Sequence, residues 1–436
     1  MLWLFLALLF MLSAWRPVMA VTLLAALLPS YLLRYEFFGL PTTFLELATY
    51  AAALGFVFKI LIDRSFRSQA ALRLEFFKTG EPRFLAALVF FLLAAVMGTI
   101  FTWHLRTSAG ALKGWFFDPA LFGAMLLASL NNKYDFYKII TALSVSVSVI
   151  SGYGLVEFFG FNDIYSSIGA RLDSIFTSPN YHALLAGPVT VLALSLLIFA
   201  RSLWQKPIYW SLLLGSVLLN LAALYYTYSF GGYLGLSLGL IFVLAGVLRS
   251  KIFSRKFVLA ALAVFVVAAG AVFLQSVTSP KFKRDFFDRQ NISSWRGRLE
   301  VWQTGLAIVK RHPVLGVGLG NYDKGYQKYV SSSLGRPPLE PKMIHAHNLF
   351  LDFWTDLGIV GLAAFLFLLF HFFSLFKKVK ETDLALSFGA AASLVTVLGH
   401  GLVDTPYFKN DLSYLFWLII FIVLHLAYVR KHAPKN

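Results

Sequence analysis

The segment from Ser294 to Gly361 contains three short polar or glycine-rich stretches in a chain that is otherwise largely apolar. They read SWRGRLEVW (Ser294–Trp302), RHPVLGVGLGNY (Arg311–Tyr322) and HAHN (His345–Asn348), and the last leads into GIVG (Gly358–Gly361). Nearly everything outside this segment reads as membrane-embedded scaffold. We therefore expect polar chemistry to be concentrated here.

The composition indicates an integral membrane protein. Hydrophobic residues make up 58% of the chain and charged residues 14%, and the mean hydropathy is +0.72, which is far too apolar for an ordinary soluble domain. A membrane helix needs roughly 20 apolar residues, and such runs recur between short polar breaks. The alternation typical of an outer-membrane barrel is not seen. The sequence thus predicts an all-α, polytopic membrane protein.

About twelve spans are predicted. The run Met1–Ala14 is either a short first span or half of a broken one, and it counts together with Ala20–Leu33 as one. The other runs are Phe44–Ile62, Phe84–Trp103, Ala111–Leu130, Phe136–Phe158, His182–Ala200, Ile208–Tyr228, Leu234–Val247, Phe257–Leu274, Leu349–Phe376, Leu384–Leu402 and Leu412–Tyr428. The chain then divides into N-terminal spans (1–275), a loop domain (276–348) and C-terminal spans (349–436).

Basic residues predict which loops share a side of the membrane. Short loops rich in Lys and Arg favour the cytoplasm, and here they are 64–83, 201–206, 249–256, 377–380 and 430–431. Alternation places the remaining loops outside, namely 34–43, 104–110, 160–180, 229–233, 276–348 and 404–411. Long loops are translocated largely regardless of charge, so the basic character of 276–348 does not reverse this orientation.

The net charge suggests an anionic partner at the outer surface. The formal charge is +17, but in a membrane protein it is divided between two sides, and no nucleic-acid partner is expected. Loop 276–348, which includes Lys342, carries an excess of cations that suits lipid phosphates or a phosphorylated ligand. A charged loop beside acidic headgroups is the alternative. Cysteine is absent, which excludes disulfides and thiolate chemistry.

Arg298 is the first candidate ligand-binding residue. Residues 294–310 read as an amphipathic helix with Ser294 as a candidate N-cap, and Arg298 and Trp302 share a face because they are four apart. A guanidinium is suited to phosphate oxygens. The alternative is an interfacial helix that Arg298 and Trp302 anchor at headgroup level.

The glycines of Gly316–Gly320 do not indicate a nucleotide-binding loop. No strand precedes them, and the Lys-Ser/Thr of a P-loop is missing. A tight turn after His312-Pro313 is the better interpretation.

His345 and His347 precede an apolar helix and are candidates for proton transfer. A metal site would need a third ligand nearby, so no metal is expected. A neutral imidazole can accept a proton near pH 7, and Asn348 could fix its tautomer or bind a sugar. A purely structural role for these histidines is the alternative.

Two further cations belong to other outer segments. Arg171 lies in GARLDSIFTSPN (Gly169–Asn180), a loop between two spans, and Lys113 lies near the outer edge of its span. A charge inside a membrane helix is costly and usually marks a site or a side chain that snorkels to the surface. For Lys113 we favour snorkelling.

The motifs described above occur in a characteristic order. That order is Arg298 to Trp302, His312-Pro313, Gly316-Val317-Gly318, Asn321-Tyr322, His347-Asn348, Gly358 and Gly361. In this order they resemble the O-antigen ligase and polymerase family, whose members have a large outer loop between late spans. His347-Asn348 with its downstream glycines is similar to the motif of the ligase branch, and Arg171 with Ser178-Pro179-Asn180 is similar to an earlier loop motif of the family.

The resemblance implies a GT-C-like glycosyltransferase of the bacterial inner membrane, with its active site facing the periplasm. The donor would be a glycan on undecaprenyl pyrophosphate and the acceptor a sugar hydroxyl of lipid A core, in contact with membrane lipids and with neither metal nor other cofactor. His347 would be the general base of an inverting displacement. Arg298 and Arg171 would neutralise the pyrophosphate, and His345 would assist or bind phosphate.

One departure from the family concerns Phe230. Relatives commonly have Ser-Arg-Gly at this point, with the arginine on pyrophosphate, whereas this chain reads YSFGG (Tyr228–Gly232). The resemblance then requires another cation in that role, and the candidates are Arg171, Lys113 and Lys342.

Three other functions stay open. A polysaccharide polymerase would use a second lipid-linked glycan as acceptor, and a protein O-oligosaccharyltransferase would transfer to Ser or Thr. A lipid or polysaccharide transporter would explain the apolar bulk without catalysis, but it predicts repeats and broken helices, and no convincing repeat is seen.

Overall fold

The computed structural model describes residues 1–37, 40–160, 171–250, 270, 274 and 294–432, and the structural statements below concern these residues. They are predominantly helical, which confirms the predicted all-α class. A short antiparallel hairpin is the exception. It consists of β1 (Arg34–Phe37) and β2 (Leu40–Thr43), with Arg34 opposite Thr43.

The helices follow the apolar runs of the sequence closely. In the first half they are α1 (Leu2–Trp15), α2 (Pro17–Ala26), η1 (Leu28–Leu32), α3 (Phe44–Ile62), α4 (Arg64–Gly80), α5 (Pro82–Ile100), α6 (Leu105–Leu112), η2 (Lys113–Phe117), α7 (Asp118–Ser129), α8 (Lys133–Gly160) and α9 (Pro179–Phe199). In the second half they are α10 (Arg201–Trp204), α11 (Pro207–Tyr226), α12 (Phe230–Arg249), α15 (Ser294–Arg311), α16 (Tyr322–Leu334), α17 (Leu349–Val379), α18 (Leu384–His400) and α19 (Asn410–His432).

Among the described residues, nine helical segments are long and apolar enough to cross a membrane, and α6, η2 and α7 together form one of them. Three predicted spans are not among the nine. The N-terminal pair forms the shorter helices α1 and α2, α18 is also shorter, and Phe257–Leu274 lies almost wholly outside the described residues. The chain is therefore a multi-pass membrane protein.

Glycines let the central helices approach closely. A Cβ atom at Gly235 of α12 would lie 2.5 Å from the Thr396 carbonyl oxygen of α18, and one at Gly239 would lie 2.0 Å from the Thr396 hydroxyl. Small residues of this kind let the backbones of membrane helices pack side by side. Helices α9 and α19 are almost completely enclosed by their neighbours, so both lie in the interior of the bundle.

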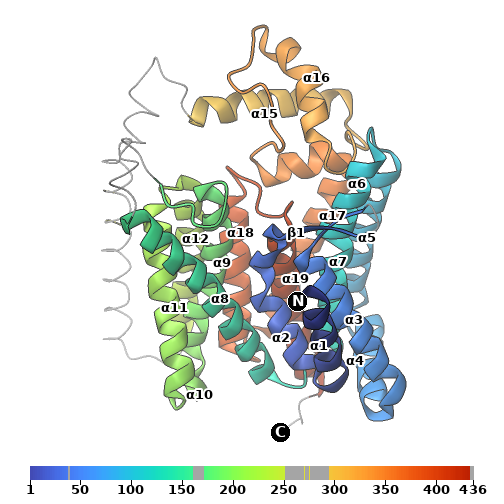
Figure 1. Ribbon diagram of the computed structural model, residues 1–436, viewed down its shortest axis with the longest axis vertical. Coiled ribbons are helices and arrows are strands. Elements are labelled where there is room, and N and C mark those ends of the chain that lie inside the picture. Colours follow the sequence, from blue (N-terminus) through green and yellow to red (C-terminus); the bar gives the residue numbers. More distant parts are fainter. Residues whose placement is uncertain (38–39, 161–170, 251–269, 271–273, 275–293, 433–436) are drawn as a thin grey trace.

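The connecting segments gather at two opposite ends of the bundle. Helices α15 and α16 lie together at one end, close to α6, whereas α4 and α10 reach the other end (Figure 1). Two contacts agree with the prediction that segments 64–83, 377–380 and 430–431 lie on the same side of the membrane. Lys378 pairs with Glu81, and Arg430 donates to the Lys378 carbonyl. We call the end with α15 and α16 the loop end. Which end faces the cytoplasm stays a prediction, as do the domain boundaries.

Helix α17 is anchored at the loop end by its first turns. Asn348 caps it, since its amide oxygen accepts from the Leu351 N–H at 3.0 Å. Gly358 interrupts its helical backbone with φ +67° and ψ −169°, a conformation that L-residues rarely adopt. A Cβ at Gly358 would lie 2.0 Å from the Val314 carbonyl oxygen. The kink therefore brings α17 against the turn after α15.

Candidate active site

His347 and Asp404 form the centre of the candidate site at the loop end. His347 Nδ1 lies 3.1 Å from Asp404 Oδ1, although 56 residues separate them in the sequence. His347 has a positive φ of 49°, which is uncommon for a residue other than glycine and costs free energy. Trp302 donates its indole N–H to the His347 carbonyl at 3.3 Å. The His347 ring is thus held by its neighbours, while its side chain stays 28% exposed.

Two groups from other helices bind the second oxygen of Asp404. Asn180, at the start of α9, donates to Oδ2 at 3.0 Å, and Arg298 of α15 lies 3.9 Å from it. Arg298 also donates to the Val403 carbonyl at 2.9 Å. Because Asp404 is buried, these partners compensate its loss of hydration.

The pKa values of the pair are shifted apart. Burial by itself would raise the pKa of Asp404, but the hydrogen bond and charge of His347, together with His400 and Arg298, hold that pKa well below its usual range. Burial by itself would lower the pKa of His347, but the hydrogen bond and charge of Asp404 outweigh it and raise the pKa. An ionised carboxylate only accepts hydrogen bonds. In the neutral ring, Nδ1 therefore carries the proton and Nε2 can accept another.

Arg171 joins the same network from the other side. Its guanidinium donates to the Thr227 carbonyl at 2.8 Å and to Asn180 Oδ1 at 3.0 Å, so Asn180 links Arg171 to Asp404. It also contacts the Tyr228 carbonyl at 3.4 Å. Of the three cations considered for the role lost at Phe230, Arg171 is therefore the one next to that segment.

His345 and Lys113 both line a cavity of about 510 Å³ that neighbours this network at the loop end. Burial, helped by the charges of His347 and Lys409, lowers the pKa of His345 to about 4 against the opposing charge of Asp404. Its ring lies near Trp115 and Phe408. Lys113 pairs with the buried carboxylate of Glu46 at 2.9 Å, so it forms an ion pair and does not simply snorkel into water.

The other two predicted ligand residues have different positions. Both polar groups of the Asn348 side chain make hydrogen bonds within the protein. Its NH₂ donates to the Leu402 carbonyl at 2.9 Å, and its oxygen caps α17. Lys342 is exposed in the segment between α16 and α17. The structure thus brings His347, Arg298 and Arg171 together, whereas Lys342 is on the surface.

The predicted turn at Gly316–Gly320 is confirmed. Gly316, Gly318 and Gly320 have φ values of 68°, 98° and 70°. The turn binds α17, because Val317 N–H donates to the Thr355 carbonyl at 2.8 Å and Gly320 N–H donates to Asp356 Oδ2 at 2.7 Å. It therefore fixes α15 and α16 against the helix that follows His347.

Sequence reasoning missed two carboxylates of the site. Asp404 forms the pair with His347, and Asp352 accepts from the Ala346 N–H at 2.6 Å and from the Thr405 hydroxyl, which ties the His345–Asn348 segment to the loop before α19. Asp352 could have been found, because a carboxylate one turn into an apolar helix marks a site by default. Within the described residues, no group of three His, Cys, Asp or Glu could hold a metal ion.

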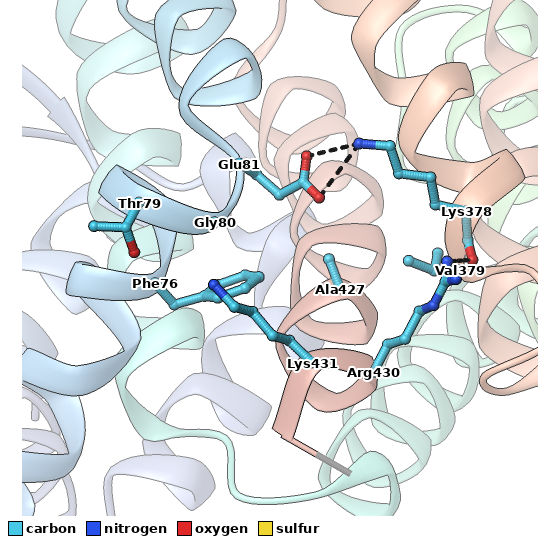
Figure 2. A pocket seen from close by; sticks show the side chains of 9 residues that line it. All are labelled: Phe76, Thr79, Gly80, Glu81, Lys378, Val379, Ala427, Arg430 and Lys431. Atoms are coloured by element: carbon cyan, nitrogen blue, oxygen red, sulfur yellow. Dashed lines mark hydrogen bonds and ion pairs between the residues drawn. The ribbon is translucent and has the colours of Figure 1, made fainter. Parts of the chain in front are cut away.

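A second charged pocket lies at the opposite end of the bundle. Figure 2 shows Lys378, Arg430 and Lys431 around it, with Glu81 paired to Lys378. The Glu81–Lys378 distance is 3.2 Å, and the Lys378 side chain is 55% exposed. An exposed pair of this kind has ample water around it and offers no shielded place for chemistry.

A protein relative and a family model match parts of this chain. An uncharacterised protein of Haemophilus influenzae is 24% identical over 185 residues, which are 39% of this chain and 44% of the relative. The alignment thus spans less than half the length of that relative. Residues 215–366 match the model of the family described as O-antigen ligase. This range holds α15, α16, Arg298, His347 and the kink at Gly358. Over these residues the chain is therefore similar to the O-antigen ligase family.

Proposed function

We propose that this protein transfers a glycan from undecaprenyl pyrophosphate to a sugar hydroxyl of lipid A core, as an O-antigen ligase of the bacterial inner membrane. The observation that carries the proposal is the His347–Asp404 pair, which lies next to two arginines. His347 and Arg298 belong to the residues that match the family model, whereas Asp404 and Arg171 lie outside them. The loop end would face the periplasm, because the basic short loops 64–83 and 377–380 lie at the opposite end.

In the proposed reaction, His347 Nε2 takes the proton of the acceptor hydroxyl. The hydroxyl oxygen bonds to the anomeric carbon of the donor sugar while the bond from that carbon to the pyrophosphate oxygen breaks. The electron pair leaves with the pyrophosphate, and a single displacement inverts the anomeric configuration. Asp404 holds the ring with Nδ1 protonated and stabilises the imidazolium that forms. Neither nucleotide sugar nor metal takes part.

The arginines would stabilise the charge that develops on the leaving pyrophosphate. Arg298 and Arg171 both lie at the Asp404 network, and both use part of their donors on backbone carbonyls. Those bonds fix the position of each guanidinium, and a prepositioned cation costs little reorganisation when the charge appears.

The test is a transfer assay with purified protein, undecaprenyl pyrophosphate-linked glycan and lipid A core, with chelator and without nucleotide. Glycan transfer is followed by gel shift. The proposal expects transfer to core and its loss in His347→Ala. Chain growth on the lipid donor without transfer to core would indicate a polymerase. Absence of both reactions would contradict the proposal and favour a transporter.

A further inference from the structure

The cavity beside His345 has an excess of positive charge. It lies between the hairpin, the start of α3 and the loop before α19, and its charged side chains are Arg34, Glu46, Lys113 and Lys409. Glu46 is neutralised by Lys113 at 2.9 Å. The two remaining charged side chains of the cavity, Arg34 and Lys409, are both positive. The cavity is therefore suited to an anion.

Lys409 is a buried cation that lines this cavity. Its Nζ is buried, and no hydrogen-bond acceptor reaches it from the described residues. It lies 3.8 Å from the ring centre of Tyr181, 5.1 Å from Tyr31 and 5.2 Å from Phe176. Aromatic faces attract an ammonium group, but they leave its three N–H donors without conventional acceptors. Burial lowers the pKa of Lys409, while the charges of Asp411 and Asp404 oppose this.

An apolar groove continues from this cavity. It has a volume of about 560 Å³, and Thr42 and Lys113 line both spaces. The rest of the groove is lined by side chains of α1 and α3, among them Trp3, Phe10 and Leu54. A groove of this volume along two helices accommodates one hydrocarbon chain, not the several chains of lipid A.

We infer that the cavity and the groove together bind a single-chain lipid phosphate, with the phosphate against Lys409 and the hydrocarbon chain between α1 and α3. The side chain of Lys409 is flexible, so its ammonium can move from the rings of Tyr31, Phe176 and Tyr181 to the phosphate. This inference rests on the proposed function, in which one substrate is a lipid pyrophosphate, and it adds where that lipid is held. Lys409 is then a binding residue beside the Asp404 network.

The first test measures binding of undecaprenyl phosphate, without glycan, to the full chain in detergent by native mass spectrometry. Lys409→Gln removes the charge and keeps a polar side chain that is one atom shorter, and we expect affinity to fall about tenfold or more. Lys328→Gln is the matched control, since Lys328 Nζ also lies over aromatic rings, 4.6 Å from Trp103, but outside the cavity. Equal affinity of the two variants would overturn the role of Lys409.

The second test narrows the groove without changing the core. Ala7 lines the groove and is exposed, so Ala7→Trp should weaken binding, whereas Leu8→Trp at the next, 52% exposed position should not. This pair also stands if Lys409→Gln does not fold. Unchanged binding by Ala7→Trp would place the chain elsewhere and overturn the inference.

Competition identifies the ligand chemistry. Undecaprenol lacks the phosphate and hexa-acylated lipid A has several chains, so both should compete poorly against undecaprenyl phosphate. Equal competition by undecaprenol would contradict the phosphate site, and equal competition by lipid A would contradict the single-chain groove. Binding needs no glycan transfer. If binding depends on Lys409 but no transfer occurs, the site stands and the proposed ligase reaction fails.

Discussion

Two charged pairs at opposite ends of the helix bundle differ in their burial. At the loop end, the Asp404 carboxylate is buried and bonded to His347 and Asn180, with Arg298 close by. At the other end, Glu81 and Lys378 form an exposed pair (Figure 2). Burying a carboxylate costs several kcal/mol unless partners compensate it, whereas an exposed pair contributes about 0–1 kcal/mol. A buried network is therefore the costly arrangement, and function is a reason to maintain it.

The largest contrast between the ends is expected for histidine. His347→Ala removes the proposed base and should lower transfer by about 10²–10⁴-fold with normal insertion and folding. His371 lines a pocket at the opposite end, and His371→Ala should leave transfer unchanged. Both rates come from the gel-shift assay. Equal losses in the two variants would remove the distinction between the ends.

Arginine provides the next comparison. Arg298→Ala should reduce transfer by about 10²–10³-fold, because a cation next to the leaving group is lost. Arg430, which donates to the Lys378 carbonyl at the opposite end, is the matched position, and Arg430→Ala should have little effect. The measurement is the transfer rate of each variant at saturating donor. A full rate in Arg298→Ala would exclude this arginine from the reaction.

The contact between α17 and the turn after α15 can be tested by a pair of glycines. Gly358 and Gly335 have nearly equal φ values of 67° and 66°, but an added Cβ meets the Val314 carbonyl at Gly358 and open space at Gly335. Gly335→Ala should cost about 1–2 kcal/mol for the left-handed backbone alone, and Gly358→Ala should cost more. Thermal unfolding in detergent compares them, and similar losses would argue against close packing at the loop end.

The smallest effect is expected at the exposed pair. Glu81→Gln should change the free energy of unfolding by less than about 1 kcal/mol and should not alter transfer. Unfolding in detergent and the transfer assay measure the two quantities. A large loss of stability would mean that the opposite end also depends on its charges.

The sequence predicted the helices well because their signal is local. Apolar runs bounded by polar breaks marked α17 from its first residue, Leu349, and the glycines of 316–320 marked a turn that needs positive φ. The hairpin of β1 and β2 was missed because four-residue strands carry little pattern. The kink at Gly358 was also invisible, because it results from contact with Val314.

The candidate site was predicted in part. Motif order singled out His347, Arg298 and Arg171, which the structure places around one carboxylate. Asp404 was missed because it lies in a different loop and only the fold brings it to His347. Helix spacing placed Arg298 and Trp302 on one face, but it could not show that they contact the site through the Val403 and His347 carbonyls, respectively. Long-range contacts of this kind leave no local signal.

The most direct test of the account is the pH dependence of transfer in the native chain and in Asp404→Asn. The base works as the neutral imidazole, so kcat/KM should rise with pH. The midpoint of this rise should lie above the ordinary histidine pKa, because Asp404 raises the pKa of His347. In Asp404→Asn the charge is lost and burial dominates, so the midpoint should move to lower pH while the rate falls. An unchanged midpoint in Asp404→Asn would contradict the claim that Asp404 sets the basicity of His347.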